Sequence, residues 1–178
     1  MRMLLLLIDR VIGKILRTYR NAVFFAKTGC KANLVGNVIL INRNVHCGKN
    51  VTIYPDVMFF GDGRIEIGDN VDIGNGTIIY ASKIGGGVSI GSNTMIAAQC
   101  YIIDMDHGTA SGELIRKQCN AVCPVIIGND VWLGANVTVL KGSVIDDGAI
   151  IGAKSLVKGH IGSNMIAVGV PAKEKRER

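Results

Sequence analysis

Aliphatic residues recur at every sixth position along most of this chain. In the clearest series, each lead residue is followed four positions later by a small or aliphatic partner. The lead residues are Ile127, Leu133, Val139, Ile145, Ile151 and Val157, and the partners are Val131, Val137, Ser143, Ala149, Ser155 and Ile161. This period predicts a solenoid in which each hexad forms a short strand and a turn, three hexads complete a triangular coil, and stacked coils bury the lead residues.

The same pattern recurs upstream in three further blocks, separated by slips of one or two residues. Their lead residues are Val35, Ile41, Cys47, Ile53 and Phe59 in the first, Ile67, Ile73 and Ile79 in the second, and Ile84, Ile90, Ile96 and Ile102 in the third. Glycine, Asn and Asp fill the turns, as in GDN at 68–70, GSN at 91–93 and GND at 128–130, because these residues tolerate the positive φ of a tight turn. About eighteen hexads predict about six coils.

The N-terminal segment MRMLLLLIDRVIGKILRTYRNAVFFAKTG has the period of an amphipathic helix instead. Its apolar face consists of Leu4, Leu5, Ile8, Val11, Ile12, Ile15, Leu16, Tyr19 and Val23. Basic residues occupy the opposite face. Asp9 and Arg10 interrupt the apolar run after six residues, whereas a transmembrane span needs about 20 and a signal peptide needs a longer apolar core followed by a cleavage site.

Two interpretations of this helix, over residues 1–28, stay open. In the first, its apolar face packs against the body of the protein or against a neighbouring subunit. In the second, the basic amphipathic helix makes a peripheral contact with an anionic membrane, at the inner face. Four further apolar residues point toward the polar side and suit either a subunit contact or a lipid contact: Leu6, Leu7, Phe24 and Phe25.

The repeat is interrupted after Ile102 by a polar segment, for which we expect an extruded loop over residues 104–124. A smooth prism has no concavity, whereas a loop that folds over a neighbouring coil makes a cleft. His107 lies where the loop leaves the coil, and a histidine there suits a general base, because the imidazole takes up a proton near neutral pH. His46 and His160 lack this setting.

The composition agrees with a single β-rich domain. Of the 178 residues, 48% are hydrophobic but only 5% aromatic, with 23 glycines against 3 prolines, a bias typical of small aliphatic side chains and tight turns. We expect a helix over residues 1–32, a solenoid domain over 33–170 and a basic tail over 171–178. The five cysteines are irregularly spaced, which indicates reduced thiols in the cytoplasm and no metal site.

The net charge of +6 belongs to the N-terminal segment. Residues 1–32 hold seven Lys or Arg and one Asp, whereas the remaining 146 residues hold thirteen basic and thirteen acidic side chains. No basic stripe with interleaved aromatic residues runs along the body, so nucleic-acid binding is not expected.

The chain resembles the hexapeptide-repeat acyltransferases through four stretches: IGSNTMIAAQCYIIDMDH, PVIIGNDVWLGANVTVLKG, IGAKSLV and AVGVPAK. The resemblance covers nearly all of residues 33–173. It is strongest to the branch of galactoside and maltose O-acetyltransferases and of capsule or exopolysaccharide O-acetyltransferases. This implies an all-β fold, the left-handed parallel β-helix. It also implies a cytoplasmic homotrimer that transfers an acetyl group from acetyl-CoA to a sugar hydroxyl in polysaccharide biosynthesis, with no metal required.

The resemblance places the catalytic base at His107. Asp104 and Asp106 flank it, and either could orient the imidazole or contact the acceptor sugar, although turn chemistry explains an Asp equally well. Arg116, in the loop, could contact the acceptor or a neighbouring subunit, although a solvated loop surface explains it too.

For the acyl donor, the resemblance points to the coils that follow the loop. Trp132, the only tryptophan, would lie at the cofactor groove, although an aromatic residue on the solenoid surface needs no such role. Small residues would let the pantetheine arm approach the backbone, and cations would suit the CoA phosphates. The small residues are Gly134, Ala135 and Ala153, and the cations are Lys158, Lys173 and Arg176. Where the galactoside enzymes have Thr-Lys after this coil, this chain has Lys158–Gly159, a departure from the family pattern.

Two other functions stay open. An N-acetyltransferase that acts on an amino sugar or on a streptogramin-like compound would share the fold and the donor. A catalytically inactive solenoid that serves as a scaffold would bind no CoA.

Overall fold

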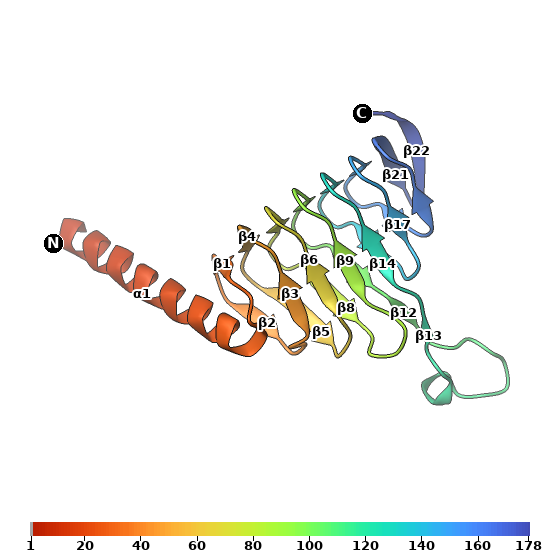
Figure 1. Cartoon of the computed structure of the whole chain (residues 1–178), viewed down its shortest axis with the longest axis horizontal. Helices are drawn as coiled ribbons and strands as arrows, with labels where there is room; N and C mark the ends of the chain where they lie inside the picture. The colour runs from red at the N-terminus through yellow and green to blue at the C-terminus, as the bar shows by residue number, and fades with distance from the viewer. Residues whose placement is uncertain (1) are drawn as a thin grey trace.

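The structure is a computed structural model that describes residues 2–178. A single long helix, α1 (Arg2–Thr28), is followed by a prism of stacked coils, and Figure 1 shows α1 extending away from one end of the prism with the C-terminal strands at the other end. Met1 and the side chains of Arg2, Leu4 and Leu5 lie outside the described part of the chain, so the expected places of Leu4 and Leu5 on the apolar face stay predictions. No helix in residues 2–178 has a long enough apolar stretch to cross a membrane.

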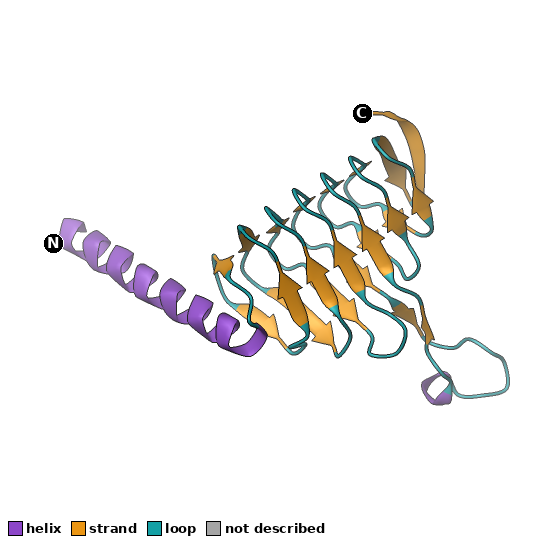
Figure 2. Ribbon diagram, in the orientation of Figure 1, coloured by secondary structure: helices purple, strands orange, loops and turns teal. Residues whose placement is uncertain are grey.

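Three sheets form the faces of the prism, and their short strands alternate with turns around every coil (Figure 2). Face A consists of β1 (Ala32–Leu34), β4 (Val51–Ile53), β7 (Asp72–Ile73), β10 (Met95–Ile96), β15 (Trp132–Leu133), β18 (Ile150–Ile151), β21 (Met165–Gly169) and β22 (Ala172–Glu177). Face B consists of β2 (Val38–Leu40), β5 (Val57–Gly61), β8 (Ile78–Ala81), β11 (Tyr101–Ile103), β16 (Thr138–Val139) and β19 (Leu156–Val157). Face C consists of β3 (Val45–Cys47), β6 (Ile65–Ile67), β9 (Val88–Ile90), β14 (Val125–Ile127), β17 (Val144–Ile145) and β20 (His160–Ile161).

The chain visits faces A, B and C in that order, once per coil. Strands of successive coils on one face pair in parallel, as when Ile96 of β10 pairs with Leu133 of β15. The two six-stranded faces B and C therefore define six complete coils, as the hexads predict. The expected fold, a left-handed parallel β-helix with an N-terminal helix and one extruded loop, is confirmed.

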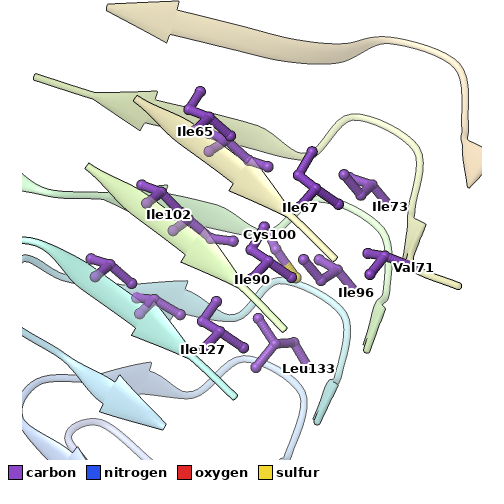
Figure 3. Packing of buried hydrophobic residues seen from close by; sticks show 14 of the residues in the cluster. Ile65, Ile67, Val71, Ile73, Ile90, Ile96, Cys100, Ile102, Ile127 and Leu133 are labelled. Atoms are coloured by element: carbon purple, nitrogen blue, oxygen red, sulfur yellow. The ribbon is translucent and has the colours of Figure 1, made fainter. Parts of the chain in front are cut away.

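The lead residues of the hexads stack inside the prism. Ile73, Ile96 and Leu133 follow one another along face A, and Ile90 and Ile127 pair along face C (Figure 3). All five are at most 2% exposed. Burying one such side chain contributes about 1.5–3 kcal/mol, so the stack of aliphatic side chains is the main source of stability.

The predicted inward orientation is wrong at three lead positions, which are exposed: Val35, Ile41 and Ile84. In the first coil, Leu34 pairs with Ile53 and Leu40 with Phe59. The two residues of each pair are nineteen positions apart, whereas three hexads would separate them by eighteen. The inward residues of the first coil therefore come one position earlier than the repeat predicts. Ile84 lies in a turn between β8 and β9 and not in a strand.

Side-chain ladders stabilise the turns between faces C and A. Asn50 donates to Asn70, and Asn70 donates to Asn93, each over 3.0 Å. All three have a positive φ, between 55° and 61°, which Asn tolerates better than most residues. Asp130 continues the series and accepts a hydrogen bond of 2.7 Å from the guanidinium of Arg178.

The two ends of the chain are attached to opposite ends of the prism. Phe24 of α1 is buried with its ring centroid 6.3 Å from that of Phe59, and the Asn21 side chain accepts a hydrogen bond from the Leu34 amide. The C-terminal residues, expected as a basic tail over 171–178, include β22, which pairs antiparallel with β21. The division into domains at residues 32 and 170 stays a prediction.

Candidate functional site

The extruded loop leaves the prism at the corner between faces B and C, which we call the B–C corner (Figure 1). Its two ends form a small antiparallel sheet, in which β12 (Met105–Asp106) pairs with β13 (Ala121–Val122). A short 3-10 turn, η1 (Ile115–Lys117), lies near the tip. The base of the loop is thus held by backbone hydrogen bonds, whereas the tip extends away from the coils.

Asp104 anchors the base of the loop from inside the protein. Its side chain is completely buried, and its carboxylate accepts hydrogen bonds from the Ser82 amide at 2.8 and 2.9 Å and from the Gly87 amide at 2.6 Å. Burial raises the pKa of the Asp104 carboxyl, while the two amide donors act in the opposite direction. The expectation that Asp104 contacts the acceptor does not fit this position, because a buried carboxylate that is already paired cannot reach a sugar.

We expect Asp104→Ala to lower the free energy of unfolding by about 1–3 kcal/mol for each backbone amide left unpaired. The methyl group of alanine cannot accept the hydrogen bonds of Ser82 and Gly87, which lie in or beside the turn before β9. Urea unfolding measures the effect. Asp106→Ala is a matched control, because it removes an exposed carboxylate from the same segment and should change stability by less than about 1 kcal/mol. Equal stability of Asp104→Ala and the parent protein would show that the carboxylate is no anchor.

His107 is exposed and follows β12 directly. The neighbouring Asp106 carboxylate lies 3.5 Å from the ammonium group of Lys141, which belongs to the next coil. An imidazole in this place combines access from solvent with a backbone that is fixed by the β12–β13 pairing. It can therefore accept a proton from a substrate that binds against the base of the loop.

Lys141 is a residue of the candidate site that sequence reasoning missed. The repeat contained the information needed to find it. Ile102 stacks on Val139. Lys141 lies two positions after Val139, just as Asp104 lies two positions after Ile102, so the two residues occupy equivalent places in successive coils. The intervening loop hides this relation along the sequence. Counting coils instead of residues would have placed a cation beside the start of the loop.

The loop itself is folded around Gln118. The side chain of Gln118 accepts from the Ala110 amide and donates to the Ala110 and Glu113 carbonyl oxygens, at 2.8–2.9 Å. Arg116 lies in η1, exposed, beside two exposed apolar residues, Leu114 and Ile115. The structure thus places Arg116 near the tip of the loop, and His107 at its base.

Four of the residues expected at the acyl donor lie together. Trp132 projects from face A, about half exposed. Gly134 and Ala135 follow it at the turn toward face B, and Ala153 occupies the same turn one coil later. A Cβ atom at Gly134 would lie 2.6 Å from the Ala153 nitrogen, so the stacking of coils already requires a glycine at this position.

The three expected cations are dispersed. Lys173 and Arg176 lie on β22, at the C-terminal edge of face A. Lys158 follows β19 at the B–C corner, the corner that carries the loop. The structure therefore groups Lys173 and Arg176 with the face of Trp132, and separates Lys158 from it.

His107 and Trp132 lie on different sides of one prism. The loop leaves from the B–C corner, and in a triangular coil this corner is opposite face A, where Trp132 projects. A single chain therefore does not bring the proposed base and the proposed donor residues together. Within residues 2–178, no three His, Cys, Asp or Glu side chains are grouped so that they could hold a metal ion.

Two family models match parts of this solenoid. Residues 124–159 match the bacterial transferase hexapeptide model, and residues 64–81 match the hexapeptide repeat of succinyl-transferase. WbbJ of Escherichia coli K12, which carries the name of a lipopolysaccharide biosynthesis O-acetyl transferase, is 38% identical in an alignment of 140 positions that covers 73% of this chain and 70% of WbbJ. Rv3034c of Mycobacterium tuberculosis, which carries the name of an acetyltransferase, is 36% identical over 78% of this chain, but this chain spans only 44% of its length.

Solved structures share the fold. A maltose O-acetyltransferase from Clostridium difficile superimposes with a TM-score of 0.62 and 26% identity, over 97% of this chain and 88% of that one. AntD, an N-acyltransferase from Bacillus cereus in complex with dTDP and 3-hydroxybutyryl-CoA, gives a TM-score of 0.70 over 83% of this chain and 80% of its own, but at 21% identity this likeness shows the fold alone. The solenoid and its loop define a hexapeptide-repeat protein. This chain belongs to the hexapeptide-repeat acyltransferases, as its sequence predicts.

Proposed function

We propose that this protein transfers an acetyl group from acetyl-CoA to a hydroxyl group of a sugar, in the biosynthesis of a surface polysaccharide. The observation that carries the proposal is an exposed histidine, His107, at the hydrogen-bonded base of the extruded loop. The similarity to WbbJ and to a maltose O-acetyltransferase supports a sugar hydroxyl as the acceptor.

In the proposed reaction, His107 acts as general base. Its neutral imidazole takes the proton of the acceptor hydroxyl while the oxygen attacks the thioester carbonyl of acetyl-CoA. The tetrahedral intermediate then collapses, the C–S bond breaks, and the CoA sulfur leaves as a thiol with the proton that the imidazolium returns. We expect direct transfer without a Cys100 intermediate: Cys100, the nearest cysteine upstream, is buried, and burial raises the pKa of its thiol to about 11, so it is a poor nucleophile.

Two remaining candidates are proposed to contact the acceptor. Asp106 is exposed beside His107 and is oriented by Lys141, 3.5 Å away. Its carboxylate can accept a hydrogen bond from a second hydroxyl of the sugar. Arg116 would need the loop tip to approach the bound sugar, which suits a contact made across a subunit boundary.

The donor is proposed to bind along face A and its turn toward face B. The exposed ring of Trp132 offers an apolar surface to the CoA arm, and the small side chains of Ala135 and Ala153 let the arm approach the backbone beside it, whereas Gly134 is buried between the coils. The phosphates would lie toward cations, for which Lys173 and Arg176 on β22 are better placed than Lys158.

A homotrimer would complete the site, because His107 and Trp132 of one chain lie on different sides of the prism. Face B supports such an assembly, since its outer surface carries a continuous row of apolar side chains in register from coil to coil. The row consists of Ile39, Met58, Ile78, Tyr101, Thr138 and Leu156, of which only Thr138 is polar. The exposed Leu114 and Ile115 at the loop tip suit a contact with the neighbouring prism.

The test of the donor is a calorimetric titration of the purified protein with acetyl-CoA. We expect binding in the micromolar range, weakened at least about tenfold by Trp132→Ala, because loss of a stacked aromatic surface costs upward of about 1.4 kcal/mol. Tyr54→Ala is the matched control: Tyr54 is 40% exposed against 48% for Trp132, and it directly follows the face A strand β4, in a coil away from β15. No binding by the folded oligomer would remove the acetyltransferase proposal and favour the inactive scaffold.

An N-acyltransferase is the second candidate, because AntD shares the fold. The same base could take a proton from an amine. Competition between a sugar and its amino analogue separates the two: preferential acetylation of the hydroxyl supports the proposal, and preferential acetylation of the amine replaces it.

A further inference from the structure

Most of α1 lies free of the prism. Only its C-terminal turns contact the first coil, through buried Phe24 and through the hydrogen bond from the Leu34 amide to Asn21. Figure 1 shows the rest of the helix extending beyond the coils. The described apolar side chains of this free part are exposed: Met3, Leu6, Leu7, Ile8, Val11, Ile12, Ile15, Leu16 and Tyr19.

The apolar face is directed away from the protein's own body. Ile15 lies nine residues before Phe24, and nine residues at 3.6 per turn make two and a half turns, so the two side chains point in roughly opposite directions. Ile15 and Tyr19 are 61% and 67% exposed, whereas Phe24 is 3% exposed. Straightening or shifting the helix cannot bury this face against the prism without breaking the contact between Phe24 and Phe59. Packing of this face against the body, which the first interpretation of the sequence allowed alongside a neighbouring subunit, therefore does not fit the structure.

The charge of α1 indicates what covers this face. Residues 2–28 hold six Lys or Arg and one Asp, whereas residues 33–178 hold equal numbers of both signs. Lys14 and Lys27 lie at the borders of the apolar face, roughly 100° and 120° around the helix from Ile15. Long basic side chains at these borders can reach the phosphates of a lipid surface while the apolar face enters it.

We infer that α1 binds an anionic lipid surface, lying in its plane with the Ile15 side in the lipid and the prism on the water side. The opposition of Ile15 and Phe24 makes this arrangement possible without any rearrangement, because the prism contact and the lipid contact use opposite sides of one helix. A neighbouring subunit is a weaker candidate for this face. The body carries no net negative charge to balance the five net positive charges of α1, and face B already supplies an apolar surface for self-association.

The test is sedimentation of the full-length protein with vesicles. We expect it to sediment with equimolar phosphatidylglycerol and phosphatidylcholine, and to bind vesicles of phosphatidylcholine alone at least about tenfold less. Ile15→Glu should lower binding at least about tenfold, since it places a charge at the centre of the buried face. Lys14→Gln combined with Lys27→Gln should lower it roughly 10- to 30-fold, at about 1 kcal/mol for each cation.

Ile84→Glu is the matched control, because Ile84 is 80% exposed on the body of the protein, away from α1; it should bind as the parent does. Circular dichroism checks that each variant keeps its helix, and light scattering gives its oligomeric mass. Three results would each overturn the inference: no sedimentation of the parent protein, equal sedimentation of Ile15→Glu, or dissociation of the oligomer by Ile15→Glu, which would assign the face to a neighbouring subunit. The acetyl-CoA titration is separate, so failure here leaves the proposed function standing.

Discussion

His107→Ala is expected to lower the rate of acetyl transfer by about 10²–10⁴-fold, the usual contribution of a positioned general base. Without the imidazole, the attacking hydroxyl has to lose its proton to water, which is not held in place. Binding of acetyl-CoA should change less than about twofold, because in the proposed reaction His107 acts on the acceptor hydroxyl while Trp132 and its neighbours hold the donor, and differences below that size are near the precision of such measurements. The loss therefore appears in kcat and not in the affinity for the donor.

Release of the CoA thiol in the presence of methyl galactoside and maltose measures the rate. His46→Ala is the matched control, since His46 is also exposed and lies on face C, far in sequence from the loop; its rate should stay within about twofold of the parent rate. If both His107→Ala and His46→Ala kept the parent rate, the general base would have to be a group other than His107.

Phe59→Ala is expected to lower the free energy of unfolding by about 3–5 kcal/mol, the typical cost of removing a large aromatic side chain from a packed core. Phe59 is fully buried, pairs with Leu40 of the first coil and lies 6.3 Å from the Phe24 ring, centroid to centroid. The cavity would therefore open where the first coil, the second coil and α1 meet. We also expect α1 to become more sensitive to proteolysis, because its anchor on the prism is lost.

Urea unfolding followed by circular dichroism gives the stability, and limited digestion with trypsin gives the release of α1. Phe25→Ala is the matched control: Phe25 neighbours Phe24 on the same helix but is 46% exposed, so its removal should cost less than about 0.5 kcal/mol. A similar loss for both variants would mean that the Phe24–Phe59 contact does not attach the helix.

The period of six could be predicted well from the sequence where the coils are regular, because each hexad is a local unit that meets only the coils next to it. Ile127, Leu133 and Val139 are accordingly buried where the repeat places them. The same reasoning failed at Val35 and Ile41, since one extra residue in the first coil shifts the inward positions. Such a shift is set by pairing with the following coil, which the local pattern does not contain.

In the candidate site, too, some features could be predicted from the sequence and others could not. The position of His107 followed from the break in the repeat, but the roles of its neighbours did not. Asp104 and Asp106 are two positions apart and chemically identical, yet one is a buried anchor for the Ser82 and Gly87 amides and the other is exposed beside Lys141. Burial and pairing across coils decide this difference, and both arise only when distant residues stack.

The sequence by itself determined the solenoid, its interruption, the amphipathic character of the N-terminal helix and the concentration of positive charge there. These properties depend on residue type and on spacing along the chain. A repeat of six residues and a helix of 3.6 residues per turn both produce regular spacings that can be recognised in the sequence. The tertiary structure decided which way each part faces: Ile15 away from the prism, Asp104 into it, and Trp132 on the side opposite the loop. Orientation depends on contacts between residues that are far apart in sequence, and those contacts exist only after the coils have stacked.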